Sequence, residues 1–378
     1  MGRQLKNTIS SDNSLVVVVE TTAQFSPPSA TAAATAELAG TRQDLTDGGC
    51  EAHDPNLYAY QSIAPAFGDG TLSSACGATC TDEIKKEEEE EEESVDTLEE
   101  KYRRDGLLVF PKAFSKYEVN QLDTAITELT TGQNKEFASR VLELVHSGKI
   151  PDFTSGDKIP WVQYEAGTDV SPTTLLQPNN ARRVRKLMGF VGYDKAIDET
   201  VHNFHLEEIV ARLLHCQVNE LELFQDMALL KPAHNGREKP WHQDKAYFDI
   251  GLETPVVGCW IAIDEATCEN GCMRMLRGGH VKGPKMHFVK RDYQICDDDV
   301  LLSFSNLTDC DVVAVPLPAG GLVLFDGMLP HGTPTNTTSK ARRALQFHWV
   351  KRGALRVGRD KQGGRTQTFG GTAHGLTC

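Results

Sequence analysis

Two histidines and one aspartate in this chain have the types and spacing of metal ligands. His242 and Asp244 lie two residues apart in the segment Trp241-His242-Gln243-Asp244, and His331 follows about 90 residues later. Side chains two apart on a β-strand point to the same face, so the imidazole and the carboxylate would lie side by side. Two histidines and one carboxylate leave other metal positions open, as in non-haem Fe(II) centres that activate dioxygen. The same residue types also suit zinc, so a zinc hydrolase is an alternative.

Arg342, eleven residues after His331, begins a predicted strand with one polar and one apolar face. The polar face carries Arg342, Ala344, Gln346 and His348. The opposite face carries Leu345, Phe347 and Trp349. This pattern is typical of a barrel whose interior holds a site. A planar guanidinium matches a carboxylate, so Arg342 is expected to bind an oxo-acid. A zinc hydrolase would give this arginine no role.

The elements that must position these residues change character along the chain. Helical composition or periodicity predicts helices over 98–105, 115–129, 135–146, 184–187 and 206–214. Short apolar runs predict strands over 106–111, 224–230, 256–263, 273–276, 311–315, 321–325 and 344–350. The segment 151–178 is rich in Gly, Pro, Asp and Thr and predicts a long loop. Helices followed by many short strands predict an α+β protein whose closed or sandwiched sheet brings His242 and His331 together.

The first 97 residues differ in composition from the rest. They are low in complexity and end in an acidic run, Glu87 to Glu93, which predicts disorder and a solubilising spacer. The folded domain is expected over 98–378. The formal net charge of the 378-residue chain is -14, which argues against general nucleic-acid binding.

Cysteine usage and hydropathy indicate where the protein resides. Ten cysteines lie between Cys50 and Cys378 without a Cys-x-x-Cys pair, so we expect reduced thiols. No apolar run approaches the ~20 residues of a membrane span. We expect a cytoplasmic protein without membrane partners, while a cleaved organellar leader stays an alternative.

Several segments between residues 98 and 352 together resemble the phytanoyl-CoA dioxygenase family. The matching pieces are Arg104-Asp105-Gly106-Leu107-Leu108-Val109, Trp241-His242-Gln243-Asp244, Gly258-Cys259-Trp260-Ile261-Ala262-Ile263-Asp264-Glu265-Ala266-Thr267, Glu269-Asn270-Gly271-Cys272-Met273, His331-Gly332 and Arg342. The resemblance implies a double-stranded β-helix (jelly-roll, cupin-like) core with flanking helices.

The same resemblance implies the cofactors and the roles of individual residues. It makes His242, Asp244 and His331 the ligands of Fe(II), and Arg342 the main anchor of the co-substrate 2-oxoglutarate. Thr333 matches a hydroxyl residue that helps bind the same carboxylate, and Gln243 and Trp260 match positions that line the co-substrate pocket. The implied reaction consumes dioxygen, hydroxylates a small organic substrate such as an acyl-CoA or a related metabolite, and releases succinate and CO2. Ascorbate is a candidate reductant.

Two features bear on the details of that reaction. Where the family usually has Pro-Gly-Ser-His, this chain has Arg277-Gly278-Gly279-His280, which puts the pocket wall in doubt. Halogenating relatives replace the carboxylate ligand by a small residue, so Asp244 disfavours halogenation. The same residues are also compatible with desaturation, with ring formation, or with a non-catalytic jelly-roll that senses 2-oxoglutarate or iron.

Other polar residues have a structural and a functional interpretation. His280 and His287 are expected to be turn and pocket-wall residues rather than extra ligands. The cluster Arg182-Arg183-Val184-Arg185-Lys186 could hold phosphates, but a solvated helix face is the favoured interpretation. Substrate contact by the loop segment 155–158 is left open.

Overall fold

A computed structural model describes residues 97–147, 158–165, 168, 171, 173–282 and 312–354. Four short strands outside these ranges are also placed: β1 (Thr8–Ile9), β2 (Leu15–Val16), β10 (Phe288–Lys290) and β11 (Asp298–Val300). The expected disorder of the N-terminal region, the acidic run, His287 and the loop residues 155–157 lie outside the described residues.

Two antiparallel sheets form the core. The large sheet has seven strands: β3 (Leu107–Phe110), β13 (Leu322–Asp326), β8 (Val257–Ala262), β15 (Arg342–Lys351), β6 (Leu221–Lys231), β5 (Val184–Met188) and β4 (Trp161–Tyr164) in spatial order. The small sheet has four: β12 (Val312–Val315), β9 (Met273–Leu276), β14 (His331–Thr333) and β7 (Lys239–His242). Between β7 and β15 the chain crosses repeatedly from one sheet to the other. This alternation confirms the predicted jelly-roll core.

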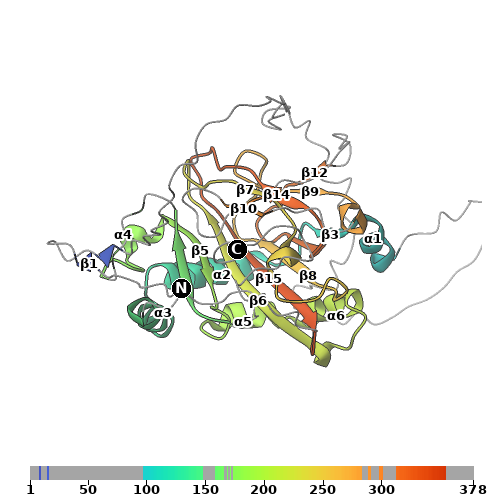
Figure 1. The fold of residues 1–378 in the computed structure, drawn as a ribbon, viewed down its shortest axis with the longest axis horizontal. Helices are drawn as coiled ribbons and strands as arrows, with labels where there is room; N and C mark the ends of the chain where they lie inside the picture. The colour runs from blue at the N-terminus through green and yellow to red at the C-terminus, as the bar shows by residue number, and fades with distance from the viewer. Residues whose placement is uncertain are drawn as a thin grey trace, which may run out of the picture.

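Helices cover the face of the large sheet that points away from the small sheet (Figure 1). They are α1 (Leu98–Asp105), α2 (Lys116–Thr130), α3 (Lys135–Ser147), α5 (Lys195–Val201) and α6 (Phe204–Leu213). The short helix α4 (Pro178–Ala181) has no buried residue. α1 and α2 begin at capping boxes, Thr97 with Glu100 and Ser115 with Glu118, which satisfy free backbone N–H groups. The apolar face of β15 packs in the helix-side core, as its sequence predicts.

The opposite, inner face of the large sheet packs against the small sheet. Trp260 and Ala344 belong to the same buried cluster as Met273, Met275 and Val313 of the small sheet. The inner face of β15 therefore faces a space between two sheets, which is where a jelly roll holds its site.

Two predictions in the first half of the domain are wrong. Residues 184–187 form strand β5 instead of a helix, and residues 161–164 of the predicted loop form strand β4. β5 pairs with β6 on one side and with β4 on the other. A run of four residues fits both helical and strand periodicity, so only this pairing decides the structure.

A buried carboxylate fixes the turn that follows β5. Asp226 on β6 accepts hydrogen bonds from the backbone N–H groups of Gly189, Phe190 and Val191 at 3.0, 2.6 and 2.8 Å. Asp226→Ala would leave these donors without their acceptor, and we expect a loss of about 3 kcal/mol in the free energy of unfolding. Urea denaturation measures this loss. Asp198→Ala, which removes an exposed bond to Gly192, is the matched control and should cost less than about 1 kcal/mol. Equal losses in the two variants would contradict the assignment.

Candidate metal centre

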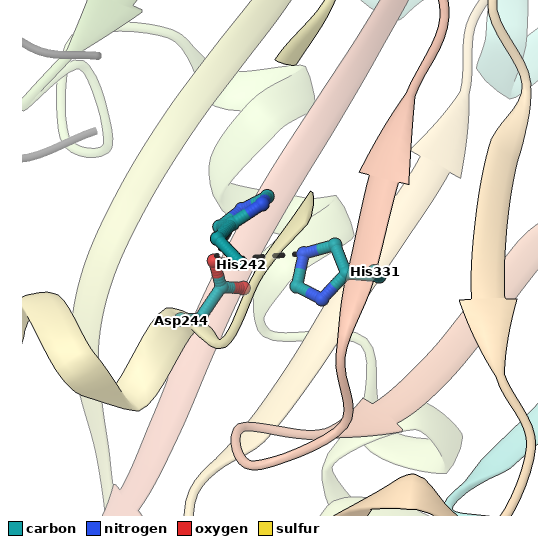
Figure 2. Close-up of side chains that lie close together, drawn as sticks. All are labelled: His242, Asp244 and His331. Atoms are coloured by element: carbon teal, nitrogen blue, oxygen red, sulfur yellow. Dashed lines mark ion pairs between the residues drawn. The ribbon is translucent and has the colours of Figure 1, made fainter. Parts of the chain in front are cut away.

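His242, Asp244 and His331 converge in the space between the sheets (Figure 2). His242 ends β7 and His331 begins β14, and the two residues are direct partners in the antiparallel register. The spacing of His242 and Asp244 predicts that both lie on one strand. Asp244 instead begins the 3-10 turn η3 (Asp244–Tyr247). One possible ligand atom from each residue lies within 4.8 Å of the others, so the three can hold one metal ion.

The two oxygens of Asp244 have different surroundings. Oδ1 lies 3.2 Å from Nε2 of His242 and 3.6 Å from Nε2 of His331. Oδ2 accepts hydrogen bonds from Nε2 of Gln346 at 3.0 Å and from Nε2 of His348 at 2.8 Å. One carboxylate oxygen therefore faces the two imidazoles, while the other is held by the large sheet.

Hydrogen bonding also orients one of the imidazoles. Nδ1 of His331 lies 2.9 Å from the backbone carbonyl oxygen of Leu329, which can only accept. With its proton on Nδ1, His331 presents the lone pair of Nε2 toward Asp244 and His242.

Burial sets the charge states that metal binding requires. Burial, together with the nearby His331, lowers the pKa of His242 to about 3, and burial also lowers the pKa of His331. Burial alone would raise the pKa of Asp244, but His331 and His348 hold it well below its usual value. Two neutral imidazoles and one carboxylate are the protonation states in which these groups bind a metal.

Sequence reasoning gave no individual role to Gln346 and His348. Both are fully or almost fully buried and hold Oδ2 of Asp244 from the polar face of β15. The signal that could have identified them was their position on the same face as Arg342. His348 and Gln346 position the carboxylate for the metal.

The role of His348 can be tested by substitution. His348→Leu should weaken iron binding about 10- to 100-fold, because Asp244 loses its shortest hydrogen bond while all three ligands remain. Equilibrium competition with a chelator measures the change. His280→Leu, whose imidazole contacts the backbone of Arg103 outside this centre, is the control. Unchanged affinity in His348→Leu would contradict a positioning role.

Next to the metal ligands lies a cavity of about 60 Å³ that Arg342, Trp260 and Thr333 help to line. Arg342 is 1% exposed, and its Nε and Nη1 have no hydrogen-bond partner among the described residues. Its guanidinium carbon lies 5.2 Å from the centre of the Trp260 ring. Burial lowers the pKa of Arg342 to about 10, so the side chain stays charged near neutral pH. A buried cation with unsatisfied donors fits a carboxylate ligand.

Gln243 differs from the expectation that it lines the co-substrate pocket. It is fully buried, it is not among the residues that line the cavity, and its amide donates to the backbone carbonyl of Met328 at 2.7 Å. This bond ties the turn after β7 to the segment before β14. Gln243 therefore joins the chain segments that carry Asp244 and His331.

The family model of phytanoyl-CoA dioxygenase (PhyH) matches residues 102–344, which include the three metal-ligand candidates and Arg342. The chain belongs to the phytanoyl-CoA dioxygenase family. The family assignment makes the chain a 2-oxoglutarate-dependent oxygenase.

Curated relatives and solved structures extend this comparison. The phytanoyl-CoA dioxygenase domain-containing protein 1 homolog of Caenorhabditis elegans is 24% identical over 68% of this chain and 90% of its own length. The Bos taurus phytanoyl-CoA dioxygenase domain-containing protein 1 is 26% identical over 67% and 88%. Among solved structures, EvdO2 from Micromonospora carbonacea var. aurantiaca is 24% identical, with a TM-score of 0.49, covering 69% of this chain and 94% of that one.

The turn Arg277-Gly278-Gly279-His280, which departs from the usual family pattern at Arg277 and Gly279, lies away from the cavity. Gly278 of the altered turn donates its backbone N–H to the carbonyl of Asp105 at the end of α1. His280 also contacts the backbone of α1. None of the four residues of this turn lines the cavity beside the metal ligands, and the turn joins α1 to the small sheet.

The basic cluster 182–186 is not a solvated helix face, because it leads into and forms strand β5. Arg185 and Lys186 are buried and line the cavity beside the metal ligands. Arg182 and Arg183 line a second, neighbouring pocket instead. In the described part of the chain, no helix has the length and apolar character needed to cross a membrane.

Proposed function

We propose that His242, Asp244 and His331 bind Fe(II), that Arg342 binds the distal carboxylate of 2-oxoglutarate, and that the reaction hydroxylates a small organic substrate. Thr333 and Trp260 complete the co-substrate end, and succinate and CO2 leave as products. The observation that carries this proposal is the placement of an unsatisfied, buried Arg342 in the same cavity as a two-histidine, one-carboxylate set.

The residues present fit both groups. Two neutral imidazole Nε2 atoms and one carboxylate oxygen suit Fe(II) and leave further positions open. When bound, the iron supplies the redox chemistry that couples oxidative decarboxylation of 2-oxoglutarate to oxidation of the substrate.

The chain itself contributes position and the exclusion of water. His348 and Gln346 hold Asp244 so that Oδ1 faces the metal position. Arg342 holds the co-substrate at one end of the cavity, so that its oxo-acid end can reach the open metal positions. The walls formed by Trp260, Met273 and Leu229 keep the reacting groups away from bulk water.

A zinc hydrolase and a non-catalytic sensor would use parts of the same site. A hydrolase would leave the buried charge of Arg342 without a role in the same cavity. A sensor would bind the same two ligands without turnover, so retention of ligand residues alone does not separate it from an oxygenase.

An anaerobic absorbance titration of the full chain tests the proposal. Fe(II) followed by 2-oxoglutarate should produce a visible charge-transfer band that requires both additions, and admission of air should then produce succinate. A band without succinate would favour the sensor. A folded, metal-loaded protein without a band would overturn the oxygenase proposal in favour of the hydrolase.

A further inference from the structure

We propose that the substrate is a small amphiphilic anion whose carboxylate or phosphate pairs with Lys186 and whose apolar body extends toward the metal ligands. This inference rests on the proposed function and names the substrate class of that site.

Lys186 is a buried cation that faces the cavity without a partner. It lies on β5, it is 4% exposed, and it lines the same cavity as His242, Asp244 and His331. Within the described ranges of the chain, no residue offers its ammonium group a hydrogen bond or an ion pair. A cation on the cavity wall that has no protein partner suits an anion that arrives with the ligand.

Apart from Arg342, the other charged side chains of this cavity have hydrogen-bond or ion-pair partners. Its described lining has six cationic side chains and two carboxylates: Arg185, Lys186, Lys231, Arg237, Lys239 and Arg342, with Glu165 and Asp244. Glu165 accepts from Arg237 at 3.1 Å and from Arg185 at 3.4 Å. Lys231 donates to the backbone carbonyl of Arg237, and Lys239 donates to the hydroxyl of Tyr247 at 3.3 Å.

The balance of charge therefore favours an anion at Lys186. Asp244 belongs to the metal set, and Arg342 is assigned to 2-oxoglutarate. Glu165 is shared by two arginines and does not pair with Lys186. With iron, 2-oxoglutarate and their protein partners in place, the remaining lining carries more positive than negative charge. A carboxylate or phosphate on the substrate would offset this excess.

Lys186 lies too far across the sheet to duplicate Arg342. Lys186 is the register partner of Leu229 on β6, which is the partner of Ala344 on β15. Two strand spacings separate β5 from β15, which is about 10 Å. Arg342 is displaced from Ala344 by two further residues along β15. The two cations therefore mark two separate anion positions on the inner face of the large sheet.

An apolar surface lies between Lys186 and the metal ligands. Met227 and Leu229 of β6 line the cavity, and Met227 packs with Met188 in a small cluster separate from the main core. Gln346, which holds Asp244, is the register partner of Met227. A ligand bound at Lys186 would therefore lie over side chains that match an apolar body before it reaches the metal.

Binding of defined probes to the full chain loaded anaerobically with Fe(II) and 2-oxoglutarate tests this inference. The probes are hexanoate, hexyl phosphate and the neutral hexanamide. Their binding is measured by the shift of the visible band and by the change in melting temperature. We expect at least one anion to bind at least tenfold more tightly than hexanamide. Lys186→Met should remove that preference, and Lys186→Arg should retain it. Lys195→Met, at an exposed lysine of α5, is the matched control and should behave as the wild type.

Each outcome is decisive. Equal binding of hexanamide and both anions, or an anion preference that survives in Lys186→Met, would overturn the inference. No response to either anion in protein that forms the band would also overturn it. The separate carboxylate and phosphate arms identify the anion that is preferred. If the band never forms, the proposed function fails, while a melting shift that depends on both the anion and Lys186 would still support the anion site.

Discussion

Replacement of Arg342 by alanine should weaken 2-oxoglutarate binding about 100-fold or more, with iron still bound, because the co-substrate loses its buried charge partner. Anaerobic titration of the iron-loaded variant with 2-oxoglutarate measures the change. The 2-oxoglutarate affinity of Arg342→Lys should lie between that of Arg342→Ala and that of the wild type, because an ammonium keeps the charge without the planar fork of a guanidinium.

Arg343 provides the matched control for this experiment. It is the next residue of β15 and its side chain lies on the helix side, where it donates to Asp264 at 2.7 Å and pairs with Asp123 of α2. Arg343→Ala should change stability without changing 2-oxoglutarate affinity. Joint loss of iron and 2-oxoglutarate in a folded Arg342→Ala variant, or equal effects at both arginines, would contradict the proposed role of Arg342.

Replacement of Asp244 by alanine should lower iron affinity at least 100-fold and reduce succinate formation to the background rate. The change removes the negative ligand and leaves His348 and Gln346 without the carboxylate oxygen that they hold. Metal analysis after gel filtration and the visible band with 2-oxoglutarate give the two readings.

Asp264→Ala removes a carboxylate of the same size from the outer end of the large sheet, where Asp264 pairs with Arg343. It should retain iron, although its stability should fall. If Asp244→Ala keeps stoichiometric iron and a normal band, Asp244 is not a ligand. Asp244→Asn separates charge from shape, because the asparagine can still occupy the same volume.

The strongly patterned parts of the chain could be predicted from the sequence. The alternation of β15 places Arg342, Gln346 and His348 on one face and its apolar residues on the other, because successive side chains on a strand point to opposite faces. The capping box at Ser115 fixes the start of α2 because its interactions span only three residues. In such places a local pattern is sufficient.

Features that depend on distant partners could not be predicted. Residues 184–187 read as a helix because only pairing with β4 and β6 makes them a strand. The hydrogen bond from Gln243 to Met328 joins residues that are 85 apart in the sequence, and no local pattern predicts it. The contact of His348 with Asp244 spans 104 residues. The metal-ligand residues could be predicted from the sequence, but the residues that hydrogen-bond to them or join their segments could not.

The two sheets carry different parts of the proposed site. Both histidines come from neighbouring strands of the small sheet, whereas Arg342 and Lys186 come from the large sheet. Lys186 lies on β5, which only the edge strand β4 separates from the end of that sheet. Amide hydrogens at this edge should exchange sooner than those of β15, which has partners on both sides. Substitutions on β5 would therefore change the proposed anion position without altering the strands that carry the two histidines.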